Sequence, residues 1–149
     1  MKSKFNKIFG FFIIFTMILI PIKANASQPK TKPQEKLFST SDFSVQANNV
    51  NLIVNNLYKV SDTLVLDGYI YNGTNLTLTE IKDFELELTD SKGTPFARII
   101  LDKIDIPKFF YPFHAKRVQF IFNNKSFNLK NTNLDNISWK FNYKYKEAP

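Results

Sequence analysis

The stretch Ile137-Ser138-Trp139-Lys140-Phe141-Asn142-Tyr143-Lys144-Tyr145 alternates large apolar side chains with polar ones. Successive side chains of a strand point to opposite faces, so this period predicts a strand with one aromatic face and one hydrated face. Similar alternation occurs at residues 118–122 and, with acidic side chains on the polar face, at residues 83–88. The three runs predict half-buried β-strands.

Three further runs, at residues 50–60, 63–71 and 94–101, are rich in Val, Ile, Leu and Tyr. The run 63–71 is apolar on both faces, which predicts a central position in its sheet. Gly68 lies within it, and we expect a bulge or a bulky neighbour to need room there. The six runs together predict most of an all-β domain.

Turn residues separate these runs. Asn72-Gly73 predicts a tight turn because both residue types accept positive φ, and Asp90–Gly93 predicts a bulged hairpin with Gly93 in the left-handed region. Residues 123–136 predict a loop held down by three apolar side chains: Phe127, Leu129 and Leu134. The pattern favours an immunoglobulin-like antiparallel β-sandwich of about six or seven strands, with a small barrel as the alternative.

The N-terminus has the layout of an export signal. Lysines precede an uncharged run at residues 8–22, and Ala24-Asn25-Ala26 supplies small residues typical of a cleavage site. We predict a signal peptide at residues 1–26, a flexible polar linker at 27–41 and a β-sandwich domain at 42–149. The alternative for the first segment is an uncleaved membrane anchor, which would be the chain's only contact with a membrane.

Charge and cysteine content narrow the function class. The formal net charge is +7, but loss of the four lysines within residues 1–26 would lower it to +3. A nearly balanced surface gives no reason to expect a nucleic-acid partner. The chain has no cysteine, so an exported domain would be held by its core alone, a tendency of Gram-positive exported proteins. We expect a secreted or cell-surface-associated protein.

Candidate catalytic and metal-binding residues are few. His114 is the only histidine and lies in a loop rich in Pro and Phe, where the interpretation is a surface histidine. Asp83, Glu85 and Glu87 fit a solvated strand face better than an acid–base pair. Asp102 and Asp105 lack the spacing of a calcium loop, and one histidine without cysteine does not make a zinc site. The sequence predicts no enzyme activity and no cofactor.

The best binding candidate is the proline-framed segment at residues 106–113. Its four aromatic residues predict either an exposed apolar interface or a lid on one end of the sandwich. The candidate protein-binding residues are Phe109, Phe110, Tyr111 and Phe113.

Short motifs add a resemblance. The stretch Leu64–Thr74 ends in Gly-Tyr-Ile-Tyr-Asn-Gly-Thr, the run Leu86–Ala97 contains Asp-x-x-Gly, and an aromatic strand follows at Val118–Phe122. Over roughly residues 50–123 this resembles a single SLAP domain, which is found in Gram-positive proteins linked to S-layer assembly and accessory secretion. The resemblance implies a cell-envelope role and no catalytic residues.

The sequence therefore predicts a secreted or envelope-associated, non-catalytic binding or assembly module, with a protein or a cell-wall polymer as its partner. It would act through the aromatic segment or by strand addition at an open sheet edge. A small inhibitor or immunity-type protein that binds an exported enzyme is the alternative, and a hydrolase is a third hypothesis.

Overall fold

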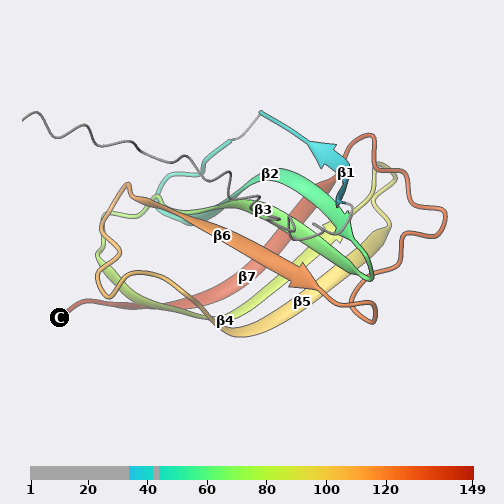
Figure 1. The fold of residues 1–149 in the computed structure, drawn as a ribbon. Coiled ribbons are helices and arrows are strands. Elements are labelled where there is room, and N and C mark those ends of the chain that lie inside the picture. The colour runs from blue at the N-terminus through green and yellow to red at the C-terminus, as the bar shows by residue number, and fades with distance from the viewer. Residues whose placement is uncertain (1–33, 42–43) are drawn as a thin grey trace, which may run out of the picture. The chain divides into compact units, whose positions relative to one another are not determined.

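The computed structural model describes residues 34–41 and 44–149, which form seven β-strands in two antiparallel sheets. One sheet has the order β1-β2-β3-β6 and the other β5-β4-β7, and Figure 1 shows them as two layers. The strands are β1 (Gln34–Ser39), β2 (Val50–Val60), β3 (Thr63–Asn72), β4 (Leu78–Thr89), β5 (Pro95–Ile104), β6 (Ala115–Phe122) and β7 (Ser138–Glu147). The predicted all-β sandwich is confirmed.

The strand order follows the immunoglobulin arrangement. Strands β2-β3-β6 occupy the positions A-B-E of one immunoglobulin sheet, and β5-β4-β7 occupy the positions C′-C-F of the other. In immunoglobulin domains strand G lies beside F. Among residues 34–41 and 44–149 no strand pairs with the corresponding side of β7, so β7 is an edge strand here.

The core lies between the two sheets and is built from the inward rows of the predicted strands. Leu64, Leu66 and Ile70 of β3 are fully buried, as the period-two pattern requires. Phe84 of β4 stacks on Phe120 of β6, in the opposite sheet, with ring centroids 5.3 Å apart. Dispersion and the removal of aromatic surface from water at such contacts hold the two layers together without cross-links.

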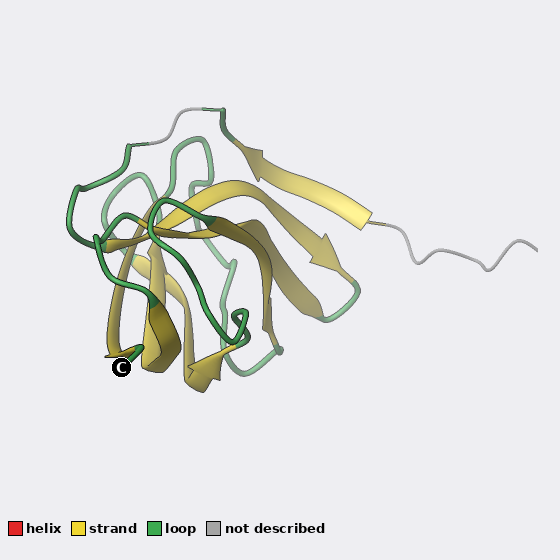
Figure 2. Ribbon diagram, turned by 90° about the vertical axis from the view of Figure 1, so that its left-hand side faces the viewer, coloured by secondary structure: helices red, strands yellow, loops and turns green. Residues whose placement is uncertain are grey.

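Strand β1 differs from the sequence-based expectation. Its residues 34–39 fall within the segment assigned to a flexible linker, yet they pair with Asn56–Val60 of β2 (Figure 2). Leu37 and Phe38 are partly buried against the core, with a register shift between Lys36 and Phe38. Because of this register shift, two consecutive apolar residues both contact the core. A search for strict alternation of apolar and polar residues does not detect such a pair.

Gly68 has the role that its place in a strand predicted. Opposite it, β2 has a bulge between Val54 and Asn56, and a Cβ on Gly68 would clash with the carbonyl oxygen of Ile53. The central position of β3, between β2 and β6, is also confirmed. A glycine is needed here because the bulged neighbouring backbone fills the space of a side chain.

The two predicted turns had different outcomes. Gly93 has a φ of +78° in the β4–β5 hairpin, as expected. The prediction of positive φ at Asn72-Gly73 is wrong, because both residues have negative φ. Residues 73–77 instead carry the chain from one sheet to the other. Gly73 is needed for close approach, since a Cβ there would lie 2.8 Å from the carbonyl oxygen of Asn49.

Asp90 closes the β4–β5 hairpin through its carboxylate. Oδ1 accepts the N–H groups of Thr94 at 2.8 Å and Lys92 at 2.9 Å. The Thr94 hydrogen bond is the largest cause that lowers the pKa of Asp90 below its ordinary value, with the Lys92 bond adding to it. Accepting hydrogen bonds favours the charged carboxylate in the folded state.

This lowered pKa predicts a pH-dependent stability. The carboxylate stabilises the fold fully above its ordinary pKa, near 4, and that contribution is lost as the pH falls toward the lower folded value. We expect the difference in unfolding free energy between wild type and Asp90→Asn to shrink between pH 6 and pH 3, measured by urea unfolding. A difference that stays constant over that range would contradict the role of the Asp90 charge.

The predicted signal peptide at residues 1–26 and residues 27–33 of the predicted linker lie outside the described residues. Within the part of the chain that the structure describes, no helix is long and apolar enough to cross a membrane.

Candidate functional site

The segment between β5 and β6, residues 105–114, crosses from one sheet to the other at one end of the sandwich. Pro107 and Pro112 lie in this crossover, and neither can donate a backbone hydrogen bond to a strand. The crossover is therefore irregular, and it brings four aromatic side chains to the same end of the domain.

Phe110 is the anchor of the segment. Its N–H donates to the Leu78 carbonyl at 2.8 Å, and its carbonyl accepts the Leu78 N–H at 3.0 Å. Its side chain is 1% exposed and belongs to the core. The structure thus places Phe110, one of the four candidate binding residues, where a partner would not touch it, and the candidate surface narrows to Phe109, Tyr111 and Phe113.

Asn72, at the end of β3, ties the segment to the sheet. Its side-chain amide donates to the carbonyls of Phe110 and Leu76, both at 2.9 Å. Its Oδ1 accepts the Thr74 hydroxyl at 2.7 Å, and its backbone carbonyl accepts the Phe113 N–H at 2.7 Å. Asn72 is fully buried, so the Asn-Gly-Thr motif serves turn chemistry here.

Three exposed rings flank the anchor, and we call Phe109, Tyr111 and Phe113 the aromatic surface. Their exposed fractions are 43%, 53% and 64%. The rings of Phe109 and Tyr111 lie 6.4 Å apart, and the Lys108 ammonium lies 5.5 Å from the Phe109 ring centre. Adjacent exposed rings with a cation beside them make an amphipathic contact surface.

Phe113 has an unusual backbone conformation. Its φ is +62°, in the left-handed region that bulky side chains rarely adopt. The hydrogen bond from its N–H to Asn72 holds the residue there and keeps its ring in solvent. Strained backbone that presents an exposed aromatic ring is typical of a functional surface.

His114 lies at the margin of the aromatic surface. Its Nδ1 is 3.0 Å from the Pro112 carbonyl oxygen, and its ring lies 5.8 Å from that of Tyr111. A histidine base in a catalytic triad contacts a nucleophile and an orienting carboxylate. The contacts found for His114 are instead a backbone carbonyl and an aromatic ring, as in a surface loop.

The carboxylates of β4 form cross-strand ion pairs. Asp83 pairs with Lys144 at 2.9 Å, Glu87 pairs with Lys140 at 2.9 Å, and Glu85 pairs with Arg98 of β5 at 2.6 Å. The hydrogen bond from Lys144 is the main reason that the pKa of Asp83 lies below its ordinary value. Within residues 34–41 and 44–149 no group of three acidic or histidine side chains is placed to hold a metal ion.

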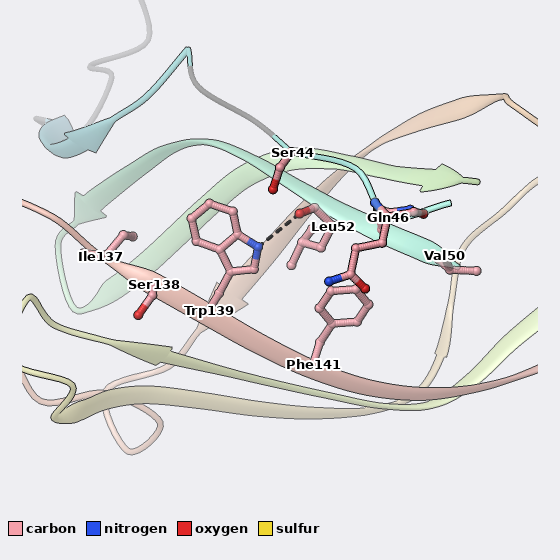
Figure 3. A pocket seen from close by; sticks show the side chains of 9 residues that line it. Ser44, Gln46, Val50, Leu52, Ile137, Ser138, Trp139 and Phe141 are labelled. Atoms are coloured by element: carbon pink, nitrogen blue, oxygen red, sulfur yellow. Dashed lines mark hydrogen bonds between the residues drawn. The ribbon is translucent and has the colours of Figure 1, made fainter. Parts of the chain in front are cut away.

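A groove that the sequence did not reveal lies between β7 and the start of β2. Figure 3 shows Trp139 and Phe141 projecting from β7 toward Leu52, with Ser44 and Gln46 above them. The groove has a volume of about 390 Å³. The only sequence signal for this groove was the aromatic row of residues 137–145. That signal was ambiguous, because the same row also fits a strand face that is entirely buried.

Comparison of the chain with protein-family models, with curated proteins and with solved structures found no match. The resemblance to a SLAP domain therefore stays a prediction from short motifs.

Proposed function

We propose that this protein is a non-catalytic binding module that recognises its partner through the aromatic surface of Phe109, Tyr111 and Phe113. The observation that carries the proposal is the contrast within one short segment. Phe110 is buried and bonded to two strands, while its neighbours Phe109 and Tyr111 expose about half of their side chains. A fixed backbone that presents apolar rings to solvent is the arrangement of a binding hot spot.

Rigid presentation would favour affinity. The segment is bonded to Asn72 and to Leu78, so little backbone freedom remains to be lost when a partner binds. Tyr and Phe have only two side-chain torsions each, so ordering them costs less than ordering long polar side chains. Most of the free energy gained when a partner buries the exposed rings therefore remains available for binding.

The partner class we propose is a protein or a cell-wall polymer at the envelope of a Gram-positive bacterium. The signal-like N-terminal sequence, the absence of cysteine and the resemblance to SLAP domains support an exported location. The aromatic rings can contact apolar groups of either partner, and the nearby Lys108 ammonium can contact its polar groups. A one-to-one complex with a co-encoded exported enzyme would instead favour the inhibitor or immunity hypothesis.

The test uses the double variant Phe109→Ser, Phe113→Asn, in which asparagine tolerates the positive φ of position 113. We expect retention of the purified protein on envelope fractions to fall at least tenfold, because exposed aromatic anchors carry much of a binding energy. The melting temperature should change by no more than a few degrees, since both side chains are exposed.

The matched control is Ile100→Ser, Ile121→Ser, which removes two exposed apolar side chains elsewhere on the domain. It should bind as the wild type does. Equal losses in the two double variants would mean non-specific hydrophobic adsorption, and unchanged retention of the aromatic variant would contradict the proposal.

A further inference from the structure

The outer edge of β7 is a second candidate interaction surface. On its inner side β7 pairs with β4 from Ser138 to Glu147, and among the described residues no strand pairs with its other side. An unpaired edge presents a row of backbone N–H and C=O groups that a further strand can bond. The vacant position corresponds to that of strand G in an immunoglobulin sheet.

The groove beside this edge is shaped by side chains with fixed positions. The Trp139 indole N–H donates to the Leu52 carbonyl at 3.0 Å (Figure 3), and the Tyr143 hydroxyl accepts the Val50 N–H at 3.0 Å. Both bonds cross from one sheet to the other. Phe141, between them in sequence, is partly buried and lines the groove. Apolar side chains of an added strand would meet an ordered aromatic wall.

The outward face of the same sheet carries charge in stripes that follow the strands. On β4 the acids Glu80, Asp83 and Glu87 pair with β7 lysines, whose side chains are 61–74% exposed. Those lysines are Lys140, Lys144 and Lys146. A lysine ammonium has three donors, so one cross-strand carboxylate leaves donors available on the side away from β4. The strand that continues the alternation beyond β7 would be acidic.

We propose that an extended acidic segment of a partner protein adds to the outer edge of β7, with apolar residues in the groove and Asp or Glu beside the lysines. Backbone hydrogen bonds would supply affinity, and the alternating side chains would supply specificity. The pattern required is alternation of acidic and apolar residues over about six to eight positions.

Charge argues against two other occupants. A second copy pairing through β7 would place lysines beside lysines, which disfavours edge-to-edge association. Residues 27–33 of this chain contain two lysines and two prolines and no acid, so they match neither the charge nor the hydrogen bonding of the edge. An acidic strand from a partner protein fits both the charge and the hydrogen bonding of the β7 edge.

The test titrates isotope-labelled protein, residues 27–149, with the capped peptide Glu-Val-Glu-Val-Thr-Val-Glu-Val and follows the amide resonances by NMR. We expect the largest shifts at residues 138–146 and at Leu52. The control peptides replace every Glu with Lys, or N-methylate alternate peptide bonds. Both should bind at least tenfold more weakly, because they lose charge complementarity or the backbone hydrogen bonds.

Two protein variants separate the β7 lysines from overall charge. The double variant Lys140→Glu, Lys144→Glu should bind the acidic peptide at least tenfold more weakly than wild type and bind the lysine peptide more tightly. Lys125→Glu, Lys130→Glu makes the same charge change on exposed loop residues and should leave both affinities within about twofold. Retained dispersion of the amide spectrum would show that each variant folds.

The proposal is overturned if the acidic peptide does not bind, if it shifts resonances away from β7, or if the two charge variants respond alike. Dimerisation through β7 in the absence of peptide would also overturn it, in favour of a second copy. The aromatic surface is intact in every one of these variants, so failure here would leave the proposed function untouched.

Discussion

Replacing Phe84 with alanine is expected to lower the free energy of unfolding by about 3–5 kcal/mol, the usual cost of truncating a buried phenylalanine. Phe84 is fully buried in β4 and stacks on Phe120 of the other sheet and on Phe141 of β7. Its removal takes away transfer energy and leaves a cavity beside the rings of Phe120 and Phe141, which relax only in part.

Urea unfolding followed by circular dichroism measures this loss. The control is Ile100→Ala in β5, whose side chain is 65% exposed, and it should change stability by less than about 0.5 kcal/mol. If the two substitutions cost similar amounts, Phe84 would not be at the junction of the two sheets.

Replacing Asn72 with alanine is expected to cost about 2–4 kcal/mol and to weaken partner binding as well. The Asn72 side chain satisfies the carbonyls of Leu76 and Phe110 and the N–H and hydroxyl of Thr74 in a fully buried position. Each buried polar group left without a partner costs about 1–3 kcal/mol. Some of these groups keep a second bond, which lowers the total.

Binding should weaken because Asn72 holds the segment that presents Phe109 and Phe113, although neither ring is altered. Chemical denaturation and retention on envelope fractions measure the two effects on the same variant. Asn124→Ala is the matched control, because Asn124 also stands in an Asn-x-Ser/Thr motif but is exposed, and it should leave both values unchanged. A stable Asn72→Ala variant, or one that binds as wild type, would contradict this account.

The strands were predictable because alternation is a local property. In β6 and β7 every second side chain turns inward, and the pattern is visible over a few residues. Strand β4 was predicted too short, since Asp83 has a φ of +49° and a register shift interrupts the alternation between Lys82 and Glu85. Irregular residues such as this one mask the continuity of a strand.

The candidate binding surface was predictable only in outline. Phe109, Phe110, Tyr111 and Phe113 are chemically alike and close in sequence. Burial of Phe110 alone depends on Leu78 and Asn72, which lie more than 30 residues away. Contacts at that separation leave no signature in the local pattern.

The amino-acid order alone determined that this chain would form extended segments with one apolar face, since neighbours two positions apart decide that property. Only the tertiary structure decided which strands became neighbours. It paired β4 with both β5 and β7, left one side of β7 unpaired among the described residues, and exposed three of the four aromatic rings of the candidate segment to solvent. Pairing order depends on contacts between distant segments and on the closing of two layers over one core, and neither is encoded in any short stretch.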